Sequence, residues 1–324
     1  MRMLRWTVIL PWFLAACAIA GYLYSLEQHI PTGTALAVLP AFLLEAAFFY
    51  VLAVDGARAR VEKLRPAVAA SALTIAAIAP YLVASLALGT FRWQSLAWIV
   101  VLAATASFWY VLLPHQPAVD IFFLIFMAVV WLSRILHRSY EPSPHPRIPM
   151  DALAQLMWFR TGIFAMVSVR RATGMGFGFW PARREWKIGA LYYVAFLGPA
   201  ALLAWWIGFA KFHMPHFGWE RSAIVVATFF GVLWVLALGE EFFFRGLLQQ
   251  WMTAWLGDWA GLLVTSLLFG SVHLWFRKFP NWRIAAIAVL LGIACGLAFR
   301  QARSIRASMV THALVVTTWR VFFS

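Results

Sequence analysis

Long apolar runs separated by short polar loops make up most of this chain. Each run is about as long as the ~20 residues that a helix needs to cross the hydrocarbon of a bilayer. The pattern predicts ten such helices: 6–24, 35–54, 67–88, 96–113, 119–136, 188–209, 222–250, 261–276, 284–299 and 307–323. The sequence therefore predicts an all-α, polytopic integral membrane helical bundle with about 8–10 transmembrane helices.

Composition supports this prediction and narrows the partners. Hydrophobic residues are 64% of the chain and charged residues 12%, against about 25% charged in soluble domains. The formal net charge is +14, and the basic residues lie in short loops between apolar runs. That placement follows the positive-inside rule and favours contact with anionic lipid headgroups, so no nucleic-acid partner is predicted. Cys17 and Cys295 fall within apolar runs, which excludes a disulfide framework.

The one long interruption of the apolar pattern covers residues 137–187. It opens with a proline-rich linker, 141–149. Residues 151–171 then mix apolar and basic side chains, which predicts an amphipathic helix lying in the membrane interface. We expect three parts: an N-terminal transmembrane bundle, 1–150, ending in the proline-rich linker; an interfacial amphipathic and basic segment, 151–184; and a C-terminal core, 185–324.

The two basic loops constrain the topology. Loop 55–66 and segment 183–187 are both rich in arginine, so both are predicted on the cytoplasmic side. An even number of helices must then cross the membrane between them, but only three apolar runs lie there. One of those runs is therefore expected to be re-entrant or interfacial. Glu45 interrupts the second run and is predicted either to pair with a neighbouring helix or to lie close to a lipid headgroup.

A cluster of ionisable residues stands out within the run 222–250. Glu240, Glu241 and Arg245 are its ionisable side chains, and each is costly at membrane depth unless it is paired or functional. On a helix, Glu241 and Arg245 share a face and can form an ion pair, whereas Glu240 lies about 100° round the axis. Glu240 is thus the candidate general base, since an apolar setting raises a carboxyl pKa toward neutrality. The alternative is a purely structural packing network.

Two histidines lie in the following apolar runs. Counting residues from the loops 251–258 and 300–306, which share one membrane face, places His273 and His312 near the depth of Glu240. Either histidine alone could be a hydrogen-bonded core residue. One carboxylate and two imidazoles from three helices at a common depth form a set suited to activating a water. Gly292 and Gly296 make a GxxxG pattern, which predicts close helix packing.

These residues also fall into three motifs. Glu240–Arg245 reads EExxxR, Phe269–His273 reads FxxxH, and His312 opens a third segment on another run. The order and spacing resemble the CPBP family of intramembrane glutamic endopeptidases, which comprises CAAX proteases and bacteriocin-processing enzymes and is also called the ABI family. The resemblance covers residues 185–324. It departs from the family at Val316, where the HxxxN motif has asparagine.

The resemblance implies an enzyme that hydrolyses a peptide bond of a membrane-associated protein or peptide. It implies Glu240 and His273 as the pair that activates water, Glu241 held by Arg245, His312 as a stabiliser of the oxyanion, and Phe269 as a supporting residue. It favours no metal cofactor, with Glu240, His273 and His312 as the ligands of a divalent ion in the alternative case. We expect an integral, multi-pass protein of the bacterial inner (cytoplasmic) membrane.

Two other functions stay open at this point. Val316 cannot donate a hydrogen bond to an oxyanion, so a non-catalytic scaffold or immunity protein that binds a peptide or partner in the same cavity is one alternative. A proton-coupled carrier using Glu240 and the histidines as a relay is the other. Such carriers often contain inverted repeats, and the sequence shows none.

Overall fold

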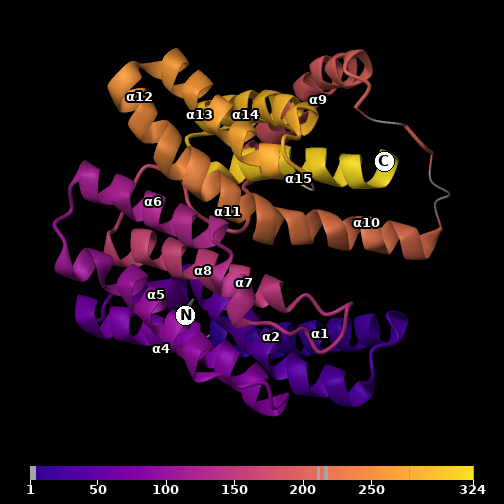
Figure 1. Ribbon diagram of the computed structural model, residues 1–324. Helices are drawn as coiled ribbons and strands as arrows, with labels where there is room; N and C mark the ends of the chain where they lie inside the picture. The colour runs from indigo at the N-terminus through magenta and orange to yellow at the C-terminus, as the bar shows by residue number, and fades with distance from the viewer. Residues whose placement is uncertain (1–4, 210–211, 215–217, 277, 324) are drawn as a thin grey trace. The chain divides into compact units, whose positions relative to one another are not determined.

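The computed structural model describes residues 5–209, 212–214, 218–276 and 278–323. In these residues the regular secondary structure is helical, with one isolated β-bridge and no strand (Figure 1). Eight of the described helices are long and apolar enough to cross a membrane. The predicted all-α polytopic membrane bundle is confirmed. The chain forms two compact units, Met1–Ala172 and Thr173–Ser324, which are described in turn.

Among its described residues, the first unit contains nine helical segments. They are α1 (Arg5–Glu27), α2 (Thr32–Ala53), α3 (Asp55–Val61), α4 (Pro66–Ala87), α5 (Trp93–Leu112), α6 (Pro117–Leu132), α7 (Ile135–Ser139), α8 (Met150–Phe164) and the π-helical η1 (Ala165–Val169). Pro66 and Pro117 each occupy the first turn of their helix, where the missing N–H costs no hydrogen bond.

The second unit contains the predicted site. Its helices are α9 (Arg183–Trp206), α10 (Trp219–Gly231), η2 (Val232–Ala237), α11 (Leu238–Glu241), η3 (Phe242–Gln249), α12 (Gln250–Leu256), α13 (Asp258–Val272), η4 (His273–Trp275), α14 (Trp282–Ala302) and α15 (Ile305–Phe322). Segments α10 to α12 continue one another as a single long helix (Figure 1). Gly257, with φ of 82°, separates that helix from α13.

The expected interfacial helix over 151–171 is wrong. Residues Met150–Val169 form a candidate membrane span, and 67% of its apolar window is buried inside the protein. An interfacial helix keeps one polar face in contact with water, and this segment does not. Its basic residue in mid-helix, Arg160, is instead paired: Nε and Nη2 donate to the Glu45 carboxylate at 2.6 and 3.1 Å. This pair also confirms that Glu45 bonds to a neighbouring helix.

With α8 counted as a crossing, the topology closes without a re-entrant segment. Arg171 donates to the carbonyl oxygen of Glu62 at 3.2 Å, so loop 62 and the end of η1 lie at the same end of the unit, which we call the basic end. Asp120, in the first turn of α6, pairs with Arg170 at that end, at 2.9 Å. At the other end, Arg92 donates to the carbonyl of Glu141 at 2.6 Å, after α6.

Helix α6 therefore runs from the basic end to the opposite end. Four helices, α4, α5, α6 and α8, join the two basic loops, and four is the even number that the positive-inside rule requires. The sequence pattern missed the fourth crossing because Arg160 lowers the hydropathy of the segment. Helix α6 has 16 residues, fewer than the usual spanning length of about 20. It is therefore not among the eight candidate spans.

Candidate active site

Glu240 and Glu241 end the short α-helical segment α11, between the π-helical segments η2 and η3. A π-turn widens a helix locally and is frequent at functional sites. Arg245 follows in η3. Its Nε lies 3.2 Å from Oε2 of Glu241, close enough for an ion pair although not aligned as a hydrogen bond. Both side chains are fully buried, so the predicted Glu241–Arg245 pair is present in the structure.

Helix α15 brings His312 against the same carboxylate. Nδ1 of His312 lies 2.7 Å from Oε1 of Glu241. A carboxylate only accepts hydrogen bonds when ionised, so Nδ1 carries the proton. Glu241 is thus held from two sides, by the guanidinium of Arg245 and by the imidazole of His312. The neighbouring Thr311 anchors α15 by donating to the carbonyl of Gly189 on α9 at 2.9 Å.

Glu240 is held far less than Glu241. Its side chain is 25% exposed, and its Oε2 lies 3.9 Å from Nε2 of His312. That oxygen is itself buried and accepts no hydrogen bond from any described residue. The two acids therefore differ as the helical spacing predicts. Glu241 is held in an ion pair, whereas Glu240 has a carboxylate oxygen that can still accept a hydrogen bond beside the imidazole of His312.

The side chains of Arg245, His273 and His312 all contact the ring of Phe269. The guanidinium carbon of Arg245 lies 4.4 Å from its centroid, a distance typical of a cation–π contact. The His312 ring meets it edge-on at 5.9 Å between centroids, and the His273 ring lies 4.8 Å away. Phe269 is fully buried, so it both shields Arg245 and fixes the two imidazoles around one apolar wall.

His273 lies at the end of α13, as the first residue of η4. Its Nδ1 is 2.8 Å from the Phe269 carbonyl oxygen. A carbonyl can only accept, so Nδ1 donates and Nε2 keeps its lone pair. Among the interactions of described residues, His273 makes no hydrogen bond or ion pair with Glu240, Glu241 or His312. The structure therefore links it to the cluster through Phe269 alone.

Two contributions from α14 were absent from the sequence prediction. The carbonyl of Gly292 accepts from Nη2 of Arg245 at 3.1 Å. Cys295 is fully buried, with its Sγ 3.6 Å from the Ser308 carbonyl. The GxxxG pattern was the available signal, since glycine lets a neighbouring helix approach its backbone: a Cβ on Gly292 would lie 3.0 Å from Cα of Ser266. It predicted the close packing but not the hydrogen bond.

A metal ion fits this cluster poorly. One ligand atom each from Glu241, Cys295 and His312 lies within 4.8 Å of the others, a set that differs from the expected Glu240, His273 and His312. However, the hydrogen bond between Glu241 and His312, at 2.7 Å, already occupies both partners. Arg245 supplies the cation that a metal would otherwise supply. We derive no chemical step through a metal.

Val316 lies one turn beyond His312 on α15 and is partly buried. The nearby threonines do not replace the missing asparagine in an obvious way. The hydroxyl of Thr318 is 2.8 Å from that of Tyr193. The hydroxyl of Thr317 is buried and has no hydrogen-bond partner among the described residues.

Comparison with known proteins shows which family this sequence is similar to. Residues 222–318 match the family described as type II CAAX prenyl endopeptidase Rce1-like. The matched stretch contains all three motifs, from Glu240 to His312. Neither the search of curated proteins nor the search of solved structures found a match to the chain. The chain is an integral, multi-pass membrane protein, and over residues 222–318 it is similar to this family, in agreement with the resemblance drawn from the motifs.

Proposed function

We propose that this protein is an intramembrane endopeptidase in which Glu240 activates the attacking water. The proposal rests on the difference between the surroundings of Glu240 and those of Glu241. Glu241 is locked by Arg245 and His312, whereas Glu240 keeps an unpaired carboxylate oxygen 3.9 Å from His312 Nε2. A general base needs an acceptor that is not already engaged, next to a group that can stabilise the developing charge.

In the proposed reaction, Glu240 takes a proton from water as the water oxygen attacks the carbonyl carbon of the scissile peptide bond. His273, whose Nδ1 is engaged with the Phe269 carbonyl, offers Nε2 as a second acceptor for that water. Glu240 then returns the proton to the leaving nitrogen, and the C–N bond breaks to give a carboxylic acid, which keeps the second proton of the water, and an amine. The sequence of steps balances without an external reagent.

His312 is assigned to the tetrahedral oxyanion. Its Nδ1–H donates to Glu241, and this hydrogen bond stabilises the protonated imidazole. Nε2–H of that imidazolium is then a charged donor next to Glu240. Glu241 and Arg245 act as positioning residues in this scheme: they orient His312 and do not touch the substrate.

The proposed substrates are membrane-associated peptides or proteins, cleaved near the cytoplasmic interface of a bacterial inner membrane. Prenylated CAAX tails, leader peptides and C-terminal anchor helices are the three classes to compare. Each can be presented to the reconstituted protein as a synthetic peptide in liposomes. Product formation identifies the class directly.

The test uses Glu240→Gln, which keeps the shape of the side chain and removes the base. We expect the rate of cleavage to fall by about 10²–10⁴-fold, the contribution typical of general acid–base catalysis. The matched control is Glu27→Gln, an equivalent change on an exposed acid at the end of α1, which should cleave at the wild-type rate. Equal rates for wild type and Glu240→Gln would rule out the mechanism.

A non-catalytic peptide-binding protein is the second candidate, and Val316 is the observation that favours it. Losing one oxyanion donor can slow acyl transfer by about 10²–10³-fold. In that case Glu240→Gln would leave the binding of the partner intact, and the wild-type protein would release no product from any of the three peptide classes.

A further inference from the structure

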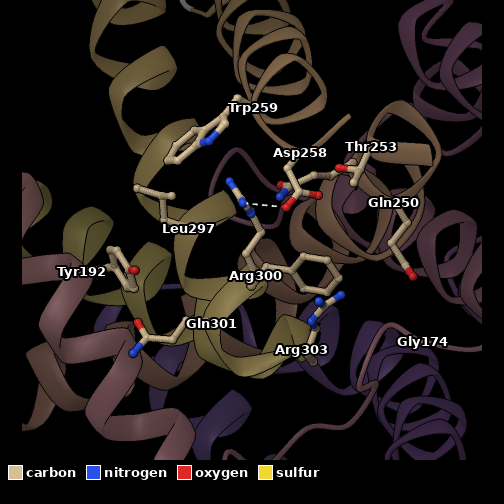
Figure 2. Close-up of a pocket in the computed structure, with 12 residues that line it drawn as sticks. Gly174, Tyr192, Gln250, Thr253, Asp258, Trp259, Leu297, Arg300, Gln301 and Arg303 are labelled. Atoms are coloured by element: carbon tan, nitrogen blue, oxygen red, sulfur yellow. Dashed lines mark hydrogen bonds and ion pairs between the residues drawn. The ribbon is translucent and has the colours of Figure 1, made fainter. Parts of the chain in front are cut away.

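A polar cavity of about 450 Å³ opens in the second unit, at the end where α12 meets α13 and α14 ends (Figure 2). Its volume falls within the range of ~300–1,000 Å³ that small-molecule sites occupy. Its polar lining includes Gln249 at the end of η3, Asp258 at the start of α13, Arg300 near the end of α14, and Arg303 just after that helix. None of these residues takes part in the proposed chemistry.

Arg300 is fixed in place but not fully paired. Its Nη2 lies 2.8 Å from Oδ2 of Asp258, drawn as the dashed line in Figure 2. Its guanidinium carbon lies 4.6 Å from the ring centroid of Trp259. Its Nη1 is buried and has no hydrogen-bond partner among described residues. Asp258 balances the charge of Arg300, so the exposed Arg303 leaves the cavity with a net positive charge.

Gln249 supplies an unused acceptor on the other side of the cavity. Its side chain is 1% exposed. The amide nitrogen donates to the Gly296 carbonyl at 3.1 Å, which fixes the orientation of the amide. Gln249 is among the residues that line the cavity, and its buried Oε1 accepts no hydrogen bond from a described residue. A buried acceptor left unpaired costs about 1–3 kcal/mol, so a ligand that donates a hydrogen bond there would be favoured.

The site thus needs a ligand with an anionic group for the arginines and a hydroxyl or other donor for Gln249. The position of the cavity in the fold indicates which kind of molecule would supply such a ligand. Trp259, at 65% exposure, lines the cavity, and tryptophan concentrates at the level of lipid headgroups. The cavity also lies where α14 ends and α13 begins, at the ends of apolar helices.

We propose that this cavity binds the headgroup of an anionic glycerophospholipid, with the phosphate on Arg300 Nη1 and Arg303 and a headgroup hydroxyl on Gln249 Oε1. The lipid would act as a specifically bound ligand, in contrast to the general attraction of a basic surface. This site is separate from the carboxylates and imidazoles of the proposed active site.

The test measures lipid retention by native mass spectrometry on the full-length protein. The protein is equilibrated in mixed micelles with phosphatidylglycerol, phosphatidylmethanol (the same charge without a headgroup hydroxyl) and phosphatidylcholine. We expect retention of phosphatidylglycerol over both other lipids. Arg303→Gln removes one charged hydrogen-bond donor and should lower that retention about tenfold. Arg283→Gln, the same change in the first turn of α14, is the matched control and should retain lipid as the wild type does.

Gln249→Leu should remove the preference for phosphatidylglycerol over phosphatidylmethanol. The comparison of these two lipids on the wild-type protein tests the same point without a variant. Equal losses in Arg303→Gln and Arg283→Gln would overturn the proposal, since they would indicate general surface attraction. Displacement of the lipid by soluble glycerol phosphate, or by a peptide with a free C-terminal carboxylate, would also overturn it. The readout does not depend on proteolysis, so it is independent of the proposed function.

Discussion

Glu241 accepts from His312 and faces Arg245 in a fully buried network, which leaves the adjacent Glu240 as the acid available for the proposed reaction. A single carboxylate could not both neutralise Arg245 and serve as a base. The i,i+4 spacing of Glu241 and Arg245 predicted their ion pair from the sequence. The bond to His312 could not be predicted, because it depends on the rotation of α15 about its own axis.

Removing Arg245 should destabilise the protein strongly, because Glu241 would then be buried with an uncompensated charge. We expect Arg245→Met to lower the free energy of unfolding by about 3–5 kcal/mol. The double variant Glu241→Gln/Arg245→Met removes both charges and should recover much of that loss. Thermal unfolding in detergent measures both effects. An Arg245→Met variant as stable as wild type would contradict the buried ion pair.

Val316 offers a gain-of-function prediction. If the oxyanion lacks the donor that the HxxxN motif would supply, Val316→Asn should restore it and raise kcat by about 10²–10³-fold, the contribution of one such donor. The steady-state rate in proteoliposomes is the measurement. Val315→Asn is not a suitable comparison, because Val315 is buried in the core. An unchanged or lower kcat in Val316→Asn would show that another group already serves the oxyanion.

At the scale of elements, the packing of α13 on α14 positions Phe269 and His273. A Cβ on Gly270 would lie 2.8 Å from the Ala285 carbonyl oxygen and 3.2 Å from the Val289 nitrogen, both backbone atoms of α14. The GxxxG pattern on α14 indicated this close packing in advance. The π-helical segments η2 and η3, which flank the acidic doublet, could not be predicted, because one added residue in a turn leaves the hydrophobic pattern almost unchanged.

Gly270→Ala should push α13 away from α14, since backbone atoms cannot move aside as a flexible side chain can. We expect a loss of stability of about 1–3 kcal/mol, typical of overpacking, together with a lower cleavage rate because Phe269 and His273 shift. Gly198→Ala on α9 is the matched control: its Cβ would meet no described atom within 4 Å. Thermal unfolding and cleavage rates should separate the two variants, and equal behaviour would contradict the role of the contact.

At the scale of the whole chain, the apolar pattern predicted the fold class and seven of the eight candidate spans. It failed at 150–169, where Arg160 made a buried helix resemble an interfacial one. Burial of Arg160 depends on Glu45, more than 100 residues earlier in the chain. No local pattern contains such a pairing. The proposed catalytic residues were found because their chemistry is unusual at membrane depth, whereas the lipid cavity uses polar residues that are ordinary at helix ends.

The corrected topology predicts which loops share a side of the membrane. In a variant without Cys17 and Cys295, single cysteines at Lys63 and Gln116 should react with an impermeant maleimide from the same side. A cysteine at Ser143 should react from the opposite side, because α6 crosses between 116 and 143. All three positions are exposed. Labelling of Ser143→Cys from the same side as Gln116→Cys would show that α6 does not cross.

The most direct test of the account is a comparison of membrane peptides from cells that carry wild-type protein or Glu240→Gln. Mass spectrometry of new peptide termini reports both the substrate and the activity. The account predicts a defined set of termini with wild type, absent with Glu240→Gln and retained with Glu27→Gln, at equal levels of folded protein. Identical sets of termini in wild type and Glu240→Gln would contradict the claim that Glu240 activates the water.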